Sequence, residues 1–152
     1  MSKRILSLIF ASFILLTGCA KSTVALPPPA DLYATIAQTV TLPEMVSLPQ
    51  DQFPDFYGIE TDWFTDAVSY TCLDSLQPDE IVIVKAADKN TADQIQEKLQ
   101  ARLAYKTKVA ENYTPDSIPF IQKGVVRQDG LTVSLLVSKD IDAIVKLYDG
   151  LK

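Results

Sequence analysis

The sequence predicts an α+β domain: a two-layer arrangement of a largely antiparallel, four-stranded sheet with helices packed on one face. Three observations carry this prediction. The run Ile81-Val82-Ile83-Val84 is apolar at consecutive positions, which is typical of a central strand covered on both faces. Asp129-Gly130 lies between two strand-like segments and is a strong hairpin signal. Residues 91–110, between the two predicted strand pairs, carry apolar side chains at helical spacing.

The elements are expected in the order helix, strand, strand, helix, strand, strand, helix. Their expected bounds are a helix from Asp31 stopped by Pro43, strands over 67–73 and 80–86, a helix over 91–110, strands over 121–128 and 131–137, and a helix from Ser138 to Gly150. Residues 42–60 contain several prolines and are expected to be irregular. Thr91 and Gln94 have the spacing of a capping box for the long helix.

The N-terminus is typical of a bacterial lipoprotein signal. Lys3 and Arg4 precede a mainly apolar region of 12 residues, and Leu16-Thr17-Gly18-Cys19 resembles the lipobox, in which the cysteine is lipidated and becomes the mature N-terminus. The apolar stretch is shorter than the ~20 residues needed to cross a bilayer. An ordinary cleaved signal peptide and an uncleaved anchor are the alternatives.

This interpretation divides the chain into a signal peptide (1–18), a lipidated cysteine with a proline-rich tether (19–30) and an α+β domain (31–152). It predicts a protein held by lipid chains, such as palmitate, on Cys19 at the extracytoplasmic face of the cell membrane. Removing residues 1–18 takes away two of the 14 basic residues and none of the 19 acidic ones, which leaves a formal charge of −7. Such an acidic chain is an improbable partner for nucleic acid.

No catalytic, cofactor-binding or metal-binding residue is predicted. The chain has no histidine, which excludes Ser-His-Asp and Cys-His catalysis, and its five glycines are too scattered for a phosphate-binding loop. Glu60, Asp62 and Asp66 are close enough in sequence to suggest acid/base or metal chemistry, although a helix cap and a solvated face explain Asp62 and Asp66 equally well.

Two further features have a structural and a functional interpretation. Cys72 has no partner once Cys19 carries lipid, and its strand-like neighbours favour a buried, inert thiol over a reactive one. The aromatic side chains between Phe53 and Phe64 could line a ligand groove or cover one end of the core, and the core is favoured.

Several segments resemble the DUF4358 domain, a domain of unknown function in bacterial lipoproteins. The resemblance is carried by Phe56-Tyr57-Gly58-Ile59, by residues 79–86 as the central strand, by residues 92–102 as the helix, and by Tyr113-Thr114-Pro115. The family is expected to have Gly-x-Tyr-Val after the second hairpin turn, where this chain has Gly130-Leu131-Thr132-Val133. The resemblance implies a family and no mechanism.

Together these observations predict a membrane-anchored, extracytoplasmic lipoprotein that is not an enzyme and that acts as a binding or accessory module in the cell envelope. Its expected contacts are the membrane, through Cys19, and an envelope protein or small ligand. The alternatives are a carboxylate-dependent hydrolase and an accessory subunit of a transporter or wall-remodelling complex.

Overall fold

The computed structural model of the chain describes residues 25–151. Within this range, five strands form one antiparallel sheet in the order β1-β2-β3-β5-β4. The strands are β1 (Met45–Ser47), β2 (Phe64–Cys72), β3 (Glu80–Ala86), β4 (Val125–Asp129) and β5 (Thr132–Val137). The α+β class and the largely antiparallel sheet are confirmed.

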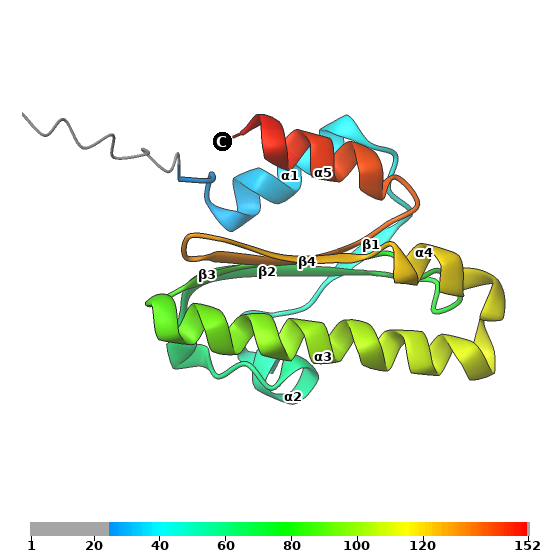
Figure 1. Ribbon diagram of the computed structural model, residues 1–152, viewed down its shortest axis with the longest axis horizontal. Helices are drawn as coiled ribbons and strands as arrows, with labels where there is room; N and C mark the ends of the chain where they lie inside the picture. Colours follow the sequence, from blue (N-terminus) through cyan, green and yellow to red (C-terminus); the bar gives the residue numbers. More distant parts are fainter. Residues whose placement is uncertain (1–24, 152) are drawn as a thin grey trace, which may run out of the picture.

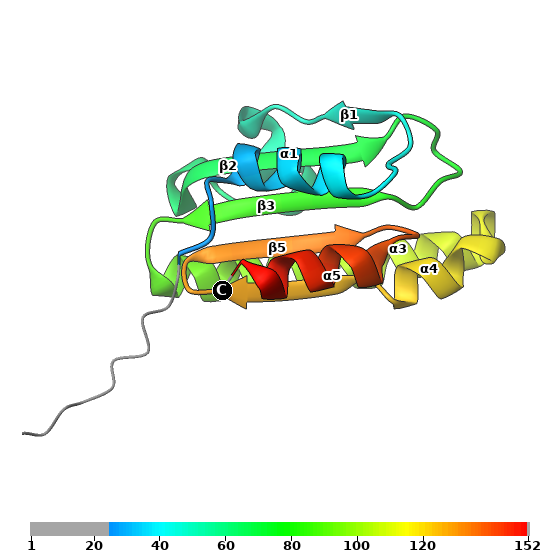
Figure 2. The ribbon, with the colours of Figure 1, turned by 90° about the horizontal axis from the view of Figure 1, so that it is seen from above.

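Helices cover both faces of this sheet (Figure 1). The long α3 (Lys89–Tyr113) and the short α2 (Phe53–Tyr57) lie on one face, whereas α1 (Pro29–Thr39) and α5 (Ile141–Gly150) lie on the other. Seen from above, α1 and α5 run side by side along the sheet (Figure 2). The prediction of two layers with helices on one face is therefore wrong.

The composition of β3 explains the third layer. Val82 and Val84 pack into the core under α3, while Ile81 and Ile83 pack into the core under α1 and α5. Both sides of the strand are apolar, and apolar surface is stable only when covered. Two separate cores, one on each face, are the consequence.

Two segments differ from the expected elements. Residues 42–60 contain β1, a strand of three residues that pairs with β2 and is too short to show a period-two pattern. Residues 121–128 begin within α4 (Ile118–Gln122) and become a strand only after Gly124. A side chain at Gly124 would lie 2.8 Å from the carbonyl oxygen of Ile121, so this junction requires glycine.

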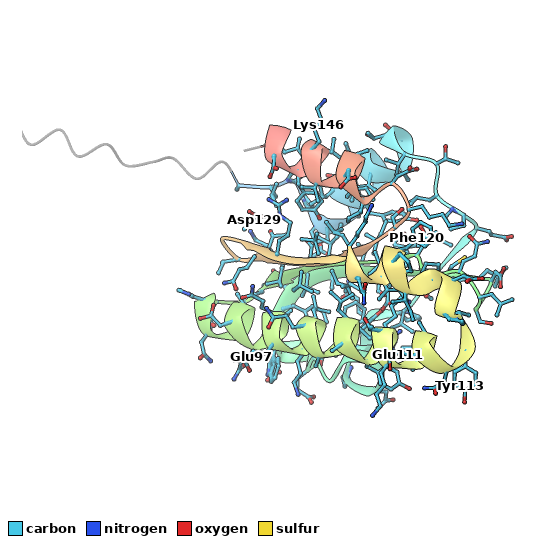
Figure 3. All side chains as sticks on the ribbon, turned by 45° about the vertical axis from the view of Figure 1, so that its right-hand side comes forward. Glu97, Glu111, Tyr113, Phe120, Asp129 and Lys146 are labelled. Carbon is cyan, nitrogen blue, oxygen red and sulfur yellow. The ribbon has the colours of Figure 1, made fainter. Side chains whose placement is uncertain are left out.

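The long helix α3 begins earlier and ends later than predicted. Asp88 caps it: its side chain accepts a hydrogen bond from the Thr91 backbone, and the Thr91 hydroxyl accepts one from the Asp88 backbone. The expected box at Thr91 and Gln94 is thus displaced by three residues. Figure 3 shows Glu97 on the outer side of α3, and Lys146 projecting from α5 beyond the opposite face of the sheet.

The folded domain begins before Asp31. Leu26 is buried in the core under α1 and α5, and α1 starts at Pro29, so part of the expected tether belongs to the domain. The predicted signal peptide and Cys19 lie outside the described residues. Across residues 25–151, no helix combines the length and the apolar character that crossing a membrane requires.

Candidate functional site

A fully buried carboxylate lies at the start of the central strand. Glu80 is the first residue of β3, and its side chain meets two cations from α3. The guanidinium of Arg102 donates to both carboxylate oxygens, at 3.0 and 3.2 Å, and the Lys106 ammonium lies 2.9 Å from Oε2. Arg102 and Lys106 are four residues apart, a spacing that places both on one helix face. The ion pairs tie α3 to the middle of the sheet.

Tyr57 of α2 completes this cluster. Its hydroxyl lies 3.1 Å from Oε1 of Glu80 and 2.6 Å from the Ser69 hydroxyl of β2. The Arg102 guanidinium lies 5.7 Å from the centre of the Tyr57 ring, within the range of a cation–π contact. We call these five residues, Tyr57, Ser69, Glu80, Arg102 and Lys106, the Glu80 cluster. They connect α2, α3, β2 and β3 through polar contacts.

The electrostatics of the cluster favour an ionised Glu80 and a protonated Tyr57. Burial alone would raise the pKa of Glu80, but the charges and hydrogen bonds of Lys106 and Arg102 together lower it. Burial, followed by the nearby Glu80 charge, raises the pKa of the Tyr57 hydroxyl, which therefore remains a donor. One carboxylate faces two cations, so the cluster carries an excess of one positive charge.

A groove of about 550 Å³ opens beside the cluster, between α2 and α3. Its lining residues are Asp55, Phe56, Tyr57, Lys98, Ala101, Arg102 and Tyr105. Phe56 is 52% exposed and Tyr105 is 61% exposed, so a ring from each helix remains open to solvent. The volume lies within the range of small-ligand sites, roughly 300–1,000 Å³.

The end of α2 shapes one wall of this groove. Gly58 has a φ of +65°, a left-handed conformation that ends the helix and favours glycine. The Lys98 side chain passes over this glycine, and its nitrogen would lie 3.4 Å from a Cβ placed there. A Cβ there would make only an ordinary contact with Lys98, so the positive φ, rather than space, is what favours glycine at this wall of the groove.

The predicted aromatic region divides between core and groove. Phe53, Tyr57 and Phe64 are buried, as the core interpretation expected, whereas Phe56 is exposed at the groove. Sequence reasoning did not identify Glu80, Arg102 or Lys106 as a cluster. The available signal was a charged residue directly before the apolar run Ile81-Val82-Ile83-Val84, together with cations four residues apart on the helix that follows.

The other candidate residues are placed differently. Glu60, Asp62 and Asp66 lie before and along the start of β2, and no three His, Cys, Asp or Glu side chains in the described part of the chain could together hold a metal ion. Cys72 is a free, buried thiol, as expected. Asp79, next to Glu80, is buried, and its Oδ2 atom has no hydrogen-bond partner.

Comparison with known proteins identifies one family. A family model described as a domain of unknown function, DUF4358, matches residues 38–138. That range includes every residue of the Glu80 cluster and of the groove. No curated protein and no solved structure matches the chain.

Proposed function

We propose that this chain, which belongs to the DUF4358 family, is a membrane-anchored extracytoplasmic lipoprotein whose domain binds a ligand in the groove between α2 and α3. One observation carries the proposal: a locally cationic groove with two exposed aromatic rings lies on a chain with a net charge of −5. Exposed rings and an unbalanced cation at a concave surface are typical of a binding site.

The position of the groove suits an anchored protein. Leu26, near the start of the described chain, packs under α1 and α5, on the face of the sheet opposite the groove. Leu26 lies seven positions after Cys19, so the two residues are at most about 25 Å apart even along an extended chain. In the anchored protein the groove would therefore open away from the tethered side, where a ligand can reach it.

The charge states of the cluster favour binding over catalysis. A general acid or base works best with a pKa near the working pH. The pKa of Glu80 is instead lowered, and that of Tyr57 is raised, so neither group exchanges a proton readily near neutrality. Both are also fully engaged in contacts within the domain.

The anchor is tested by exchanging each cysteine in turn. Cys19→Ser removes the sulfur to which lipid would be attached, so the protein should leave the membrane fraction of the expressing cells. Cys72→Ser is the matched control, because Cys72 is buried within the domain, and it should remain in the membrane fraction. Membrane retention of Cys19→Ser, with signal cleavage unaffected, would contradict lipid anchoring.

The binding role is tested by photocrosslinking in living cells. A photoreactive phenylalanine analogue replaces Tyr105, in the groove, or Tyr113, which is 78% exposed at the end of the same helix. Binding in the groove predicts crosslinked products from position 105 that position 113 does not give. Identical or absent products at the two positions would refute the proposed site.

A further inference from the structure

The cations at the groove are not fully neutralised. Arg102 lines the groove, but the carboxylate that it contacts is shared with Lys106. Lys98 adds a second cation to the lining, and Asp55 is its only carboxylate. The groove and the cluster beneath it therefore hold three cations against two carboxylates. An anionic group would restore the balance through a charge-assisted hydrogen bond.

The rest of the lining suits a ring that carries hydroxyl groups. Phe56 and Tyr105 present exposed aromatic surface, against which the C–H face of a sugar ring can pack. The Asp55 carboxylate can accept hydrogen bonds from hydroxyl groups, and the Lys98 ammonium can donate them. A purely apolar ligand would leave both of these groups unused.

We propose that the groove binds a sugar acid, with the ring against Phe56 and Tyr105 and the carboxylate at Lys98 and Arg102. This inference rests on the proposed binding function and adds the chemical class of the ligand. Each part of the ligand meets a matching group: the ring meets the aromatic surface, the hydroxyl groups meet Asp55, and the carboxylate meets the excess positive charge.

The test is a titration of the full-length protein in detergent, followed by NMR or calorimetry. N-acetylmuramic acid is the probe, and N-acetylglucosamine, the same amino sugar without the 3-O-lactyl group that carries the carboxylate, is the matched neutral sugar. Poly-glutamate supplies carboxylates without a ring. We expect N-acetylmuramic acid to bind roughly tenfold more tightly than N-acetylglucosamine, since the pairing of one carboxylate distinguishes them. Poly-glutamate should bind more weakly than N-acetylmuramic acid.

Variants locate the site without disturbing the buried cluster. Lys98→Gln and Tyr105→Ala change exposed groove residues and should each weaken binding of N-acetylmuramic acid by roughly fivefold or more. Lys108→Gln and Tyr113→Ala, which change exposed residues of the same helix outside the groove lining, should bind like the wild type.

Each remaining outcome overturns the inference. Equal affinity for the two amino sugars would show that the groove does not recognise the carboxylate. Tighter binding of poly-glutamate than of N-acetylmuramic acid would indicate a polypeptide ligand. If no sugar binds, the ligand class is wrong. The crosslinking comparison of positions 105 and 113 then decides separately whether the groove is a binding site.

Discussion

The two faces of the sheet carry similar tyrosine clusters, but the surroundings of the two clusters differ. Under α3, Tyr57 contacts the Ser69 hydroxyl at 2.6 Å and lies beneath Arg102. Under α5, Tyr148 donates to the Ser134 hydroxyl at 2.9 Å, and Arg127 lies 4.8 Å from its ring centre. In both cases a helix tyrosine is hydrogen-bonded to a strand serine and covered by an arginine.

The difference lies in the arginine's partner and in what surrounds the cluster. Arg127 pairs with Asp129 and Asp149, both of which retain contact with solvent. Arg102 pairs with the fully buried Glu80, beside a groove with exposed aromatic rings. The contacts among tyrosine, serine and arginine therefore occur on both faces of the sheet. The α2/α3 face differs in having a buried carboxylate and an open groove beside these contacts.

The largest effect is expected from Glu80. Glu80→Gln leaves two partly buried cations without a countercharge, and breaking a buried ion pair in this way typically costs about 3 kcal/mol or more. Glu97→Gln, on the outer side of α3, the helix that carries Arg102 and Lys106, should change the free energy of unfolding by less than about 0.5 kcal/mol. Urea denaturation at pH 7 compares them. Similar losses in both variants would show that the buried pairing contributes little.

The same substitution has a defined pH dependence. The folded state lowers the pKa of Glu80 below its ordinary value of 4.5, so the carboxylate binds a proton less readily in the folded than in the unfolded chain. Its contribution to stability is therefore complete above about pH 4.5 and is lost as the pH falls through the lowered value. The stability difference between wild type and Glu80→Gln should shrink on acidification, as measured by urea denaturation from pH 7 to pH 3. A difference that stays constant would contradict this charge state.

Replacing Tyr57 or Tyr148 by phenylalanine compares the two clusters directly, and effects of intermediate size on the free energy of unfolding are expected. Tyr148→Phe removes one bond between neutral hydroxyl groups and should lower the free energy of unfolding by about 1 kcal/mol. Tyr57→Phe removes contacts to Ser69 and to the Glu80 carboxylate, and about 2 kcal/mol is expected because bonds to charged groups are stronger. Thermal unfolding with matched urea data would rank them. Equal losses, or a larger loss in Tyr148→Phe, would show that the contact with Glu80 adds no stability.

The smallest effect is expected at the surface of the α5 face. Asp149→Asn removes one of the two carboxylates that pair with Arg127, and Asp149 is itself exposed. Exposed ion pairs contribute less than about 1 kcal/mol, so a loss near 0.5 kcal/mol is expected, and added salt should reduce it further. A loss of unfolding free energy as large as that of Glu80→Gln would show that the ion pairs on the two faces contribute equally to stability.

The sequence predicted what depends on local pattern. The strand over 80–86 has the predicted bounds, and a hairpin forms at Gly130, which has a positive φ. Its two loop residues are Gly130 and Leu131, one position later than predicted, because Asp129 still pairs with Thr132 in the sheet. The apolar run within that strand also indicated that both faces of the sheet are covered. The prediction of helices on one face was inconsistent with this indication. The three-residue β1 and the α4 turn gave no periodic signal.

The site was harder to predict, because its parts meet only through packing. Glu80 is separated from Arg102 by 22 residues and from Tyr57 by 23, so no spacing in the sequence relates them. An aromatic-rich segment could be recognised, but the division between buried Phe53 and exposed Phe56 depends on how α2 lies against α3.

We infer that the Glu80 cluster shapes the binding groove between α2 and α3, and that the tyrosine cluster under α5 does not contribute to it. The most direct measurement is the yield of photocrosslinked product from position 105 in cells, in the Tyr57→Phe and Tyr148→Phe backgrounds at equal protein levels. Each variant removes one buried hydroxyl, from opposite faces of the sheet. The account predicts a reduced yield in Tyr57→Phe and an unchanged yield in Tyr148→Phe. An equal reduction in both backgrounds, or none in either, would contradict it.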